Sequence, residues 1–309
     1  MRKVIIDCDP GHDDAMALLL AFAHPDTLDV LAVGTVGGNH HLDKITQNAQ
    51  RILQVIHQNV LLYQGCFEPF IQALPIQPGA HGDSGMDGLS VLDDVTYPIE
   101  AQHAVEGYKE LLMRHKNVTL IGLGPLTNIA MLLKMYPQVK SSIEMISIMG
   151  GGIDHGNVTP YAEFNIYADP EAAKIVFESG IPITMAGLDV TEKSCLSYEQ
   201  ILSLKNQGTV SHFSYELLEF YHQSGKQFGF DESAIHDAVA VACLIYPELF
   251  VHKDYAIEIS CSGITRGMTA TDLRLKQDKE KNVKALIDVD QEKFSNLLLQ
   301  AIQLHDRRQ

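Results

Sequence analysis

Short apolar stretches and helix-like stretches alternate along the first two thirds of the chain. An apolar stretch at residues 4–6 precedes a helical stretch at 15–21, and a second at 28–36 precedes a helical stretch at 43–57. Strands separated by helices are joined by right-handed crossovers, which place them parallel in one sheet with helices on both faces. Further strands are expected at 60–63, 118–123, 143–149 and 183–186, and further helices at 126–135 and 170–179.

Three parts of the chain depart from this alternation. Residues 67–102 are rich in proline, glycine and aspartate, and so long a loop in a compact domain is usually functional. Residues 207–235 predict a helix that ends in an aromatic loop, and residues 256–287 predict a small antiparallel extension before a final helix at 291–304. Because no repeat or low-complexity linker occurs, we expect residues 1–309 to form a single α/β domain around a mostly parallel, Rossmann-like sheet.

The composition excludes several classes of binding partner and of structural site. The 309 residues include 39 acidic and 23 basic side chains, a formal net charge of −16, which disfavours a nucleic-acid surface. The five cysteines are scattered without a Cys-x-x-Cys pair, which disfavours a disulfide framework and a structural zinc site. Reduced thiols and the lack of an apolar leader or a bilayer-length apolar stretch predict a cytoplasmic protein with no membrane partner.

Four carboxylates lie within eight residues at the first predicted strand-to-helix turn. They belong to Asp7, Asp9, Asp13 and Asp14. Carboxylates this close repel one another, and a fold tolerates them mainly where a cation compensates. An acidic helix N-terminus would explain Asp13 and Asp14 through the helix macrodipole, but it leaves Asp7 and Asp9 unexplained. The cluster therefore predicts a site for a hard divalent cation.

Other polar motifs also follow predicted strands. They are Gly-Gly-Asn at 37–39, a Gly-x-Gly-Pro segment within 122–128, Met-Gly-Gly-Gly at 149–152, and Asp189. In a parallel sheet the carboxyl ends of the strands meet at one edge, where ligands bind. The glycines at 150–152 lack the lysine and the spacing of a phosphate-binding loop, so a nucleotide cofactor is rejected.

Two more polar pairs are candidates for the same edge. His236 and Asp237 open a predicted helix, where a capping or core role is the simpler interpretation of each. Glu163 and Asn165 are two residues apart, so an extended segment would point both to one side.

The order of these motifs resembles that of the inosine–uridine-preferring nucleoside hydrolases. The resemblance begins with Asp7-Cys8-Asp9-Pro10-Gly11-His12-Asp13-Asp14-Ala15 and covers almost the whole chain. It continues through Gly38-Asn39, His81-Gly82-Asp83, Asp87-Gly88, Gly124-Pro125-Leu126-Thr127-Asn128, Met149-Gly150-Gly151, Glu163-Phe164-Asn165-Ile166, Ala168-Asp169-Pro170-Glu171-Ala172-Ala173 and His236-Asp237-Ala238. So many motifs in one order make a chance match very improbable.

The resemblance implies a metal and a sugar site. It implies one calcium ion per subunit, held by Asp9, Asp14, Asp237 and the backbone carbonyl of Leu123. This agrees with the hard-cation site that the acidic cluster predicts independently. The resemblance also implies that Asp13 binds the ribose 2′-hydroxyl. The other residues implied at the ribose and the pocket wall are Asn39, Met149, Asn157, Glu163 and Asn165.

The implied reaction is hydrolysis of the N-glycosidic bond of a ribonucleoside, releasing ribose and a free base. Asp9 is expected to act as general base, because it can both bind the ion and accept a proton from water. His236 and His81 match family histidines that serve the departing base, and the second is found in members that favour pyrimidines. Together with the absence of tryptophan, this predicts a preference for uridine and cytidine, with inosine as the alternative. Gln227 and Phe230 align with base-side contacts, and the family implies a homo-oligomer, a tetramer or a dimer.

Two other classes remain open from the residues alone. A magnesium-dependent phosphohydrolase would use Asp7 as nucleophile, although the lysine that such a site needs is not evident. A non-enzymatic sugar- or nucleoside-binding protein would keep the ribose contacts but would not need Asp9 beside a metal-bound water.

Overall fold

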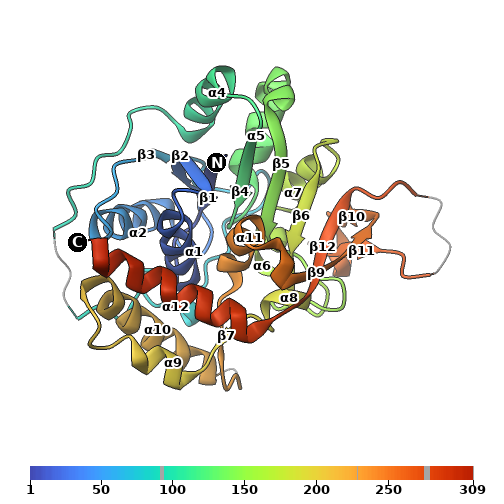
Figure 1. Ribbon diagram of the computed structural model, residues 1–309. Helices are drawn as coiled ribbons and strands as arrows, with labels where there is room; N and C mark the ends of the chain where they lie inside the picture. Colours follow the sequence, from blue (N-terminus) through green and yellow to red (C-terminus); the bar gives the residue numbers. More distant parts are fainter. Residues whose placement is uncertain (91–93, 228, 275–278, 309) are drawn as a thin grey trace.

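The computed structural model describes residues 1–90, 94–227, 229–274 and 279–308. A sheet of eight strands runs through its centre (Figure 1). The order across the sheet is β3-β2-β1-β4-β5-β6-β12-β9. Adjacent strands are parallel except β9, which runs antiparallel to β12 at one edge. The strands are β1 (Arg2–Cys8), β2 (Leu28–Thr35), β3 (Leu61–Gln64), β4 (Val118–Gly122), β5 (Ile143–Met149), β6 (Ile183–Ala186), β9 (Phe250–Tyr255) and β12 (Val283–Val289).

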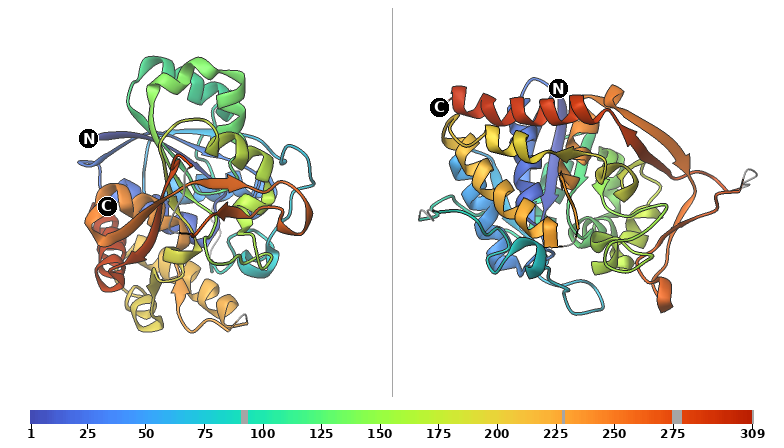
Figure 2. Two further views of the ribbon diagram at one scale, coloured as in Figure 1. Left: turned by 90° about the vertical axis from the view of Figure 1, so that its right-hand side faces the viewer. Right: turned by 90° about the horizontal axis from the view of Figure 1, so that it is seen from below.

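Helices cover both faces of this sheet (Figure 2). One face carries α1 (His12–Ala23), α2 (Leu42–Val55), α10 (Thr209–Gln227), α11 (His236–Ile245) and α12 (Gln291–Arg308). The other face carries α4 (Ala104–Arg114), α5 (Thr127–Met135) and α7 (Pro170–Phe177).

The two faces of the sheet form two separate hydrophobic cores. Val4 and Ile6 of β1 pack in one core, and Ile5 between them packs in the other, as the two-residue period of a strand requires. Every residue of α1 is buried, because α11 and α12 pack against it. A helix enclosed in this way has no polar face, which explains the continuous apolar run after Asp14.

Shorter elements fill the connections. The helices are α3 (Pro78–His81), α6 (Phe164–Ala168), α8 (Leu188–Thr191) and α9 (Tyr198–Ser203), and the 3-10 turns are η1 (Pro137–Ser142), η2 (Pro247–Leu249) and η3 (Gly263–Thr265). Two small antiparallel sheets pair β7 (Cys195–Leu196) with β8 (Ser233–Ala234), and β10 (Ile257–Ile259) with β11 (Thr269–Thr271).

The predicted fold class is confirmed, with one correction in the C-terminal part. The antiparallel extension expected at 256–287 is limited to β10 and β11, because β12 joins the central sheet parallel to β6. The buried Val283, Ala285 and Leu286 explain this position, since a central strand must bury apolar side chains. Local sequence gives no sign of it, because the partner strand lies about a hundred residues earlier.

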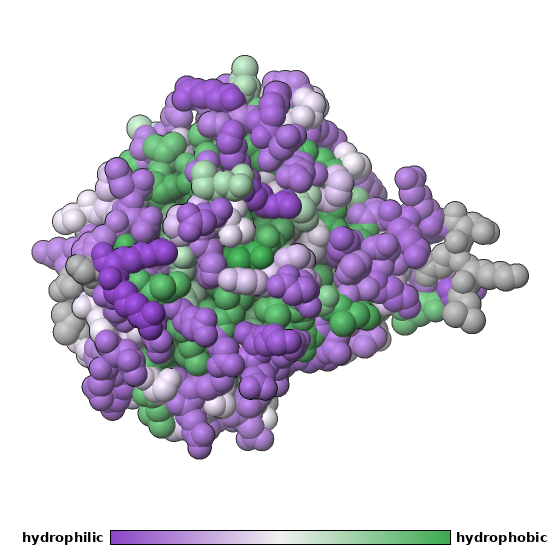
Figure 3. Space-filling view, in the orientation of Figure 1, coloured by the Kyte–Doolittle hydropathy of each residue, from purple (hydrophilic) through white to green (hydrophobic). Residues whose placement is uncertain are grey.

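The exposed surface is mostly polar on the face drawn in Figure 3, where apolar side chains are dispersed among hydrophilic ones. No helix within the described residues is long and apolar enough to cross a membrane.

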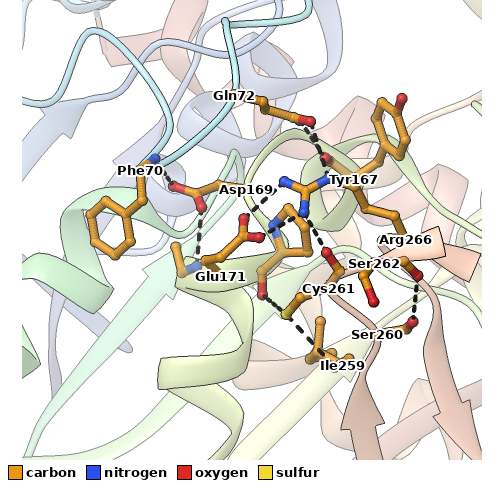
Figure 4. Close-up of polar contacts among 12 residues, drawn as sticks. Phe70, Gln72, Tyr167, Asp169, Glu171, Ile259, Ser260, Cys261, Ser262 and Arg266 are labelled. Carbon is orange, nitrogen blue, oxygen red and sulfur yellow. Dashed lines mark hydrogen bonds and ion pairs between the residues drawn. The ribbon is translucent and has the colours of Figure 1, made fainter.

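Arg266 joins three segments that are distant in sequence (Figure 4). Its guanidinium donates to both carboxylate oxygens of Glu171 at 2.6 and 2.8 Å, and its Nε donates to Oε1 of Gln72 at 3.1 Å. Asp169 accepts hydrogen bonds from the backbone N–H groups of Phe70 and Ala172, which caps α7 and fixes the loop after β3. The motif at 168–173 therefore has a structural role as the start of α7.

Candidate active site

The structure has a cavity of about 740 Å3. Its lining comes from loops that follow the parallel strands and from segments that pack beside these loops. Most of the residues that the sequence predicted for the site line it, namely Asp13, Asn39, His81, Leu123, Met149, Asn157, Glu163, Asn165, Phe230, His236 and Asp237. Gln227 is exposed at the end of α10 and is not among the described residues that line this cavity. A cavity of this size at the carboxyl edge of a parallel sheet fits a small polar molecule.

Three carboxylates converge at one end of the cavity. Asp13, Asp14 and Asp237 each place a carboxylate oxygen within 4.8 Å of the other two, and all three side chains are buried. Asp13 and Asp14 lie in the first turn of α1, and Asp237 lies in the first turn of α11, which packs against α1. Burial, followed by the charge of Asp14, raises the pKa of Asp13 to about 7.

Asp9 lies beside this group and has an unpaired oxygen. Its Oδ2 accepts a 2.7 Å hydrogen bond from the backbone N–H of Asn39, while its Oδ1 is buried with no hydrogen-bond partner among the described residues. Burial and the neighbouring Asp14 raise the pKa of Asp9 well above its usual range. An unpaired buried carboxylate oxygen is costly, and a hard cation would compensate both the oxygen and the surrounding charge. The residues present therefore fit such an ion.

Backbone groups hold these carboxylates in place. Oδ1 of Asp14 accepts from the backbone N–H of Asp9 at 3.2 Å, and Oδ2 accepts from that of Gly11 at 3.0 Å. Gly38 and Gly124 approach the Asp9 carboxylate so closely that an added Cβ would lie 2.0 and 2.2 Å from its oxygens. Glycine is therefore required at both positions, because the backbone there lies too close to the Asp9 carboxylate for a side chain.

The side of the cavity near Leu123 and Met149 is organised by Asn165. Its Nδ2 donates to the carbonyl of Leu123 at 2.7 Å and to that of Met149 at 3.2 Å. Glu163 accepts from the backbone N–H groups of Asn165 and Ile166, which makes it the N-cap of α6. Asn165 lies in this short helix, so the segment is not extended, although Glu163 and Asn165 both line the cavity.

The neighbouring polar groups are also held by backbone contacts. Burial raises the pKa of Glu163 to about 7. Hydrogen bonds from backbone N–H groups, including that of Gly151, act in the opposite direction and lower this pKa. Asn157 accepts a 3.0 Å hydrogen bond from the backbone N–H of Phe164.

Histidine and tyrosine rings form another wall of the cavity. Nδ1 of His81 lies 3.0 Å from Nδ1 of the buried His12, and Tyr221 stacks on both rings. Nδ1 of His236 lies 2.8 Å from Oγ1 of Thr191. Burial lowers the pKa of His236 to about 4 and that of His81 well below its usual range.

Sequence reasoning missed Tyr221 and His12. Tyr221, Ser224 and Gly225 all line the cavity from α10, at the three- and four-residue spacings of one helix face. That spacing was visible within the predicted helix at 207–235, but nothing local showed that this face meets the site. His12 stood inside the acidic motif, where the carboxylates dominated the interpretation.

Asp7 is separate from the cavity. Its Oδ1 accepts hydrogen bonds from the Tyr108 hydroxyl at 2.6 Å and from Nδ2 of Asn128 at 2.8 Å, and all three side chains are buried. Asp7 is not among the cavity-lining residues of the described chain. This placement removes the nucleophile that a phosphohydrolase would need, so Asp7 has a structural role.

Asp7→Ala is expected to lower the free energy of unfolding by about 2–4 kcal/mol, because it leaves a buried hydroxyl and a buried amide without their acceptor. Asp7→Asn keeps Oδ1, and burial already raises the pKa of Asp7 to about 7, so this neutral variant should lose less than about 1 kcal/mol. Urea unfolding of both variants measures the difference. Equal stability of Asp7→Ala and the unaltered protein would contradict the structural role.

The fold and cavity define an α/β protein with a cavity at the carboxyl edge of its sheet that fits a small polar molecule. The family model of the inosine–uridine preferring nucleoside hydrolases matches residues 4–296. A pyrimidine-specific ribonucleoside hydrolase of Photobacterium profundum is 42% identical over 97% of this chain and 98% of its own length. A protein of the same name from Shigella boydii is 40% identical over 98% of each chain. Among solved structures, a purine-preferring ribonucleoside hydrolase from Gardnerella vaginalis superposes with a TM-score of 0.92 at 29% identity, covering 99% of this chain and 100% of its own.

The chain therefore belongs to the inosine–uridine-preferring nucleoside hydrolase family. The family resemblance and the prediction of a ribonucleoside hydrolase are confirmed.

Proposed function

We propose that this enzyme hydrolyses pyrimidine ribonucleosides, uridine and cytidine, to ribose and a free base, and that it requires calcium. The observation that carries the proposal is a group of four buried carboxylates, those of Asp9, Asp13, Asp14 and Asp237. Asp13 and Asp237 line a cavity that also has His81 and His236 in its wall. Asp14 lies within 4.8 Å of both, and its carboxylate accepts a hydrogen bond from the backbone N–H of Asp9. The negative charge at one end of the cavity would stabilise a bound cation and a cationic transition state. The imidazole groups in the wall would interact with the departing base.

The residues that would hold calcium are Asp9, Asp14, Asp237 and the carbonyl of Leu123. Oxygen donors alone make up this set, as calcium prefers, and the unpaired Oδ1 of Asp9 supports it. When bound, the ion would lower the pKa of a coordinated water and bring that water to the substrate.

The ribose would be held by Asp13, Asn39, Asn157, Glu163 and Asn165. All five residues line the cavity; Asp13, Glu163 and Asn165 are buried, Asn39 is partly buried and Asn157 is exposed. The carboxylates and amides among them match the several hydroxyls of a sugar. Glu163 and Asn165 are fixed by their backbone contacts, which prepares the cavity before a substrate enters.

Asp9 is the proposed general base, because it offers an unpaired oxygen to the proton of the attacking water. Cleavage of an N-glycosidic bond develops positive charge on the sugar. The carboxylates of Asp13, Asp14, Asp237 and Glu163 would stabilise that charge in a site that excludes much of the solvent.

Support for pyrimidine substrates comes from the relatives and from the base side of the cavity. The relatives at 40–42% identity are named pyrimidine-specific, whereas the purine-preferring structure is 29% identical. His81, His236, Tyr221 and Phe230 form the wall in which we place the base, with His81 and His236 serving its departure.

We further propose that the enzyme works in the cytoplasm as a dimer or tetramer. The five cysteines are all free thiols, which fits a reducing compartment. Cell fractionation and light scattering on the purified protein test these two points.

Ribose release from uridine, cytidine, inosine, adenosine and guanosine tests the substrate and the metal together. We expect kcat/KM for uridine and cytidine to exceed kcat/KM for the three purine nucleosides by at least about tenfold. Such a ratio requires only a modest difference in the free energy of transition-state binding. Prior removal of calcium should lower the rate at least about a hundredfold, with recovery when calcium is returned. Faster hydrolysis of inosine would overturn the pyrimidine assignment, and full activity after chelation would overturn the calcium assignment.

A further inference from the structure

Asp189 holds two consecutive backbone N–H groups of the loop that follows β5, residues 150–162. Its Oδ2 accepts from the N–H of Ile153 at 2.8 Å, and its Oδ1 accepts from that of Asp154 at 3.0 Å. Asp189 lies in α8, which follows β6, the strand that pairs with β5. It is not among the described residues that line the cavity, so any effect on the site must pass through the loop.

Thr269 holds the residue just before these two. It lies in β11, and its hydroxyl accepts from the backbone N–H of Gly152 at 3.0 Å and donates to the carbonyl of Gly152 at 2.6 Å. The side chain is buried, and a Cβ added to Gly151 would lie 2.7 Å from its Cγ2. Both the hydroxyl and the methyl group of Thr269 therefore contact the loop, which leaves the backbone there little space to shift.

The four consecutive N–H groups of residues 151–154 are thus all satisfied inside the protein, because Glu163 accepts from that of Gly151. Beyond this fixed stem, the loop lines the cavity with His155, Gly156, Asn157 and Val158. Oδ1 of Asn157 accepts from the backbone N–H of Phe164, and its Nδ2 has no partner among the described residues. That amide group is therefore free to donate to a ligand.

We infer that Thr269 and Asp189 are positioning residues, which hold the loop after β5 so that the Asn157 amide lies ready for a hydroxyl group of the substrate. A group that is fixed before the substrate arrives loses little conformational entropy on binding, which strengthens binding. The contact between Asn157 and ribose rests on the proposed function, whereas the fixed loop is a property of the free protein.

Thr269→Val tests the hydroxyl, because it keeps the branched shape and removes only the hydrogen bonds. We expect KM for uridine to rise at least about fivefold with kcat within about twofold, since a loss of binding shared by ground state and transition state appears in KM. A purely structural role would lower the fraction of folded enzyme, which reduces kcat and leaves KM unchanged. That outcome would overturn the inference.

Two variants show whether the effect belongs to this hydroxyl. Thr269→Ser keeps the hydroxyl and should hold KM within about twofold of the unaltered enzyme. Thr271→Val is the matched control, because Thr271 lies two residues along the same strand and its buried Oγ1 has no hydrogen-bond partner among the described residues. It should leave KM unchanged. A rise in KM in either variant equal to that in Thr269→Val would contradict the role of the Thr269 hydroxyl.

Asp189→Ala tests the second contact independently. It removes the acceptor of two N–H groups and should raise KM for uridine in the same way as Thr269→Val, again with kcat within about twofold. An unchanged KM would remove Asp189 from the inference.

Hydrogen exchange of the free protein tests the fixed loop without turnover. In the unaltered protein, the N–H groups of residues 152–154 should exchange slowly. Relative to the N–H groups of β5, exchange should become at least about tenfold faster at Gly152 in Thr269→Val, and at Ile153 and Asp154 in Asp189→Ala. Fast exchange at these positions in the unaltered protein would overturn the inference. If uridine is not hydrolysed at all, the proposed function fails, while hydrogen exchange still decides whether the loop is held.

Discussion

Asp9→Asn is expected to lower uridine hydrolysis at least about a thousandfold and to weaken calcium binding, while raising the stability of the calcium-free protein. The amide keeps an oxygen for the backbone N–H of Asn39 and has nearly the same shape. It removes the oxygen that we assign to the metal and to proton transfer, and either loss is severe for a metal-assisted hydrolysis.

The gain in stability follows from the direction of the pKa. Burial and the nearby Asp14 raise the pKa of Asp9 in the folded state, so the carboxyl binds its proton more tightly there than in the unfolded chain. Above the unfolded pKa, such a group opposes folding, and the penalty grows until pH exceeds the folded pKa. A neutral amide escapes the penalty, so we expect about 1–2 kcal/mol more stability at pH 7 without calcium.

Urea unfolding without calcium, calorimetric titration with calcium, and ribose release measure the three effects of Asp9→Asn. Asp26→Asn makes the same chemical change at an exposed site and should alter none of them. Retained turnover would exclude Asp9 as general base, and unchanged calcium affinity would exclude it as a ligand.

Gly124→Ala is expected to lower activity about a hundredfold although it alters no charge. The added Cβ would lie 2.2 Å from Oδ1 of Asp9, and the three heavy atoms nearest to it all belong to Asp9. Since this contact is impossible, the carboxylate must move, and a displacement of about 1 Å at a catalytic group is enough for such a loss. Calcium affinity should fall together with activity.

Gly180→Ala is the matched control for this variant. Gly180 has a φ of 79°, so alanine is strained there, yet its added Cβ would meet nothing within 4 Å. It should cost about 1 kcal/mol of stability and leave activity and calcium affinity unchanged. Normal activity in Gly124→Ala would show that the position of Asp9 is not critical.

Strand positions follow from the local sequence, whereas strand pairing and side-chain exposure do not. The strand pattern predicted β1, β2, β4, β5 and β6 within one or two residues, because buried parallel strands are continuous apolar runs. The C-terminal strand β12 was assigned to the wrong sheet, because strand pairing is decided by partners far away in the chain. The resemblance implies a base-side contact for Gln227, which is exposed at the end of α10 and is not among the described residues that line the cavity.

The fold class, the family and the presence of a cation site could all be inferred from the amino-acid sequence alone. Hydrophobic periodicity and turn residues are properties of short stretches of sequence, so they can be recognised without a structure. The same holds for the acidic cluster from Asp7 to Asp14, whose carboxylates must repel one another because they are close in sequence. Tertiary structure decided what each acid does: Asp7 bonds with Tyr108 and Asn128, whereas Asp9 retains an unpaired oxygen. It also decided that His12 meets His81, nearly seventy residues later. Burial and hydrogen-bond partners come from packing between distant segments, and these set the protonation and the role of a side chain.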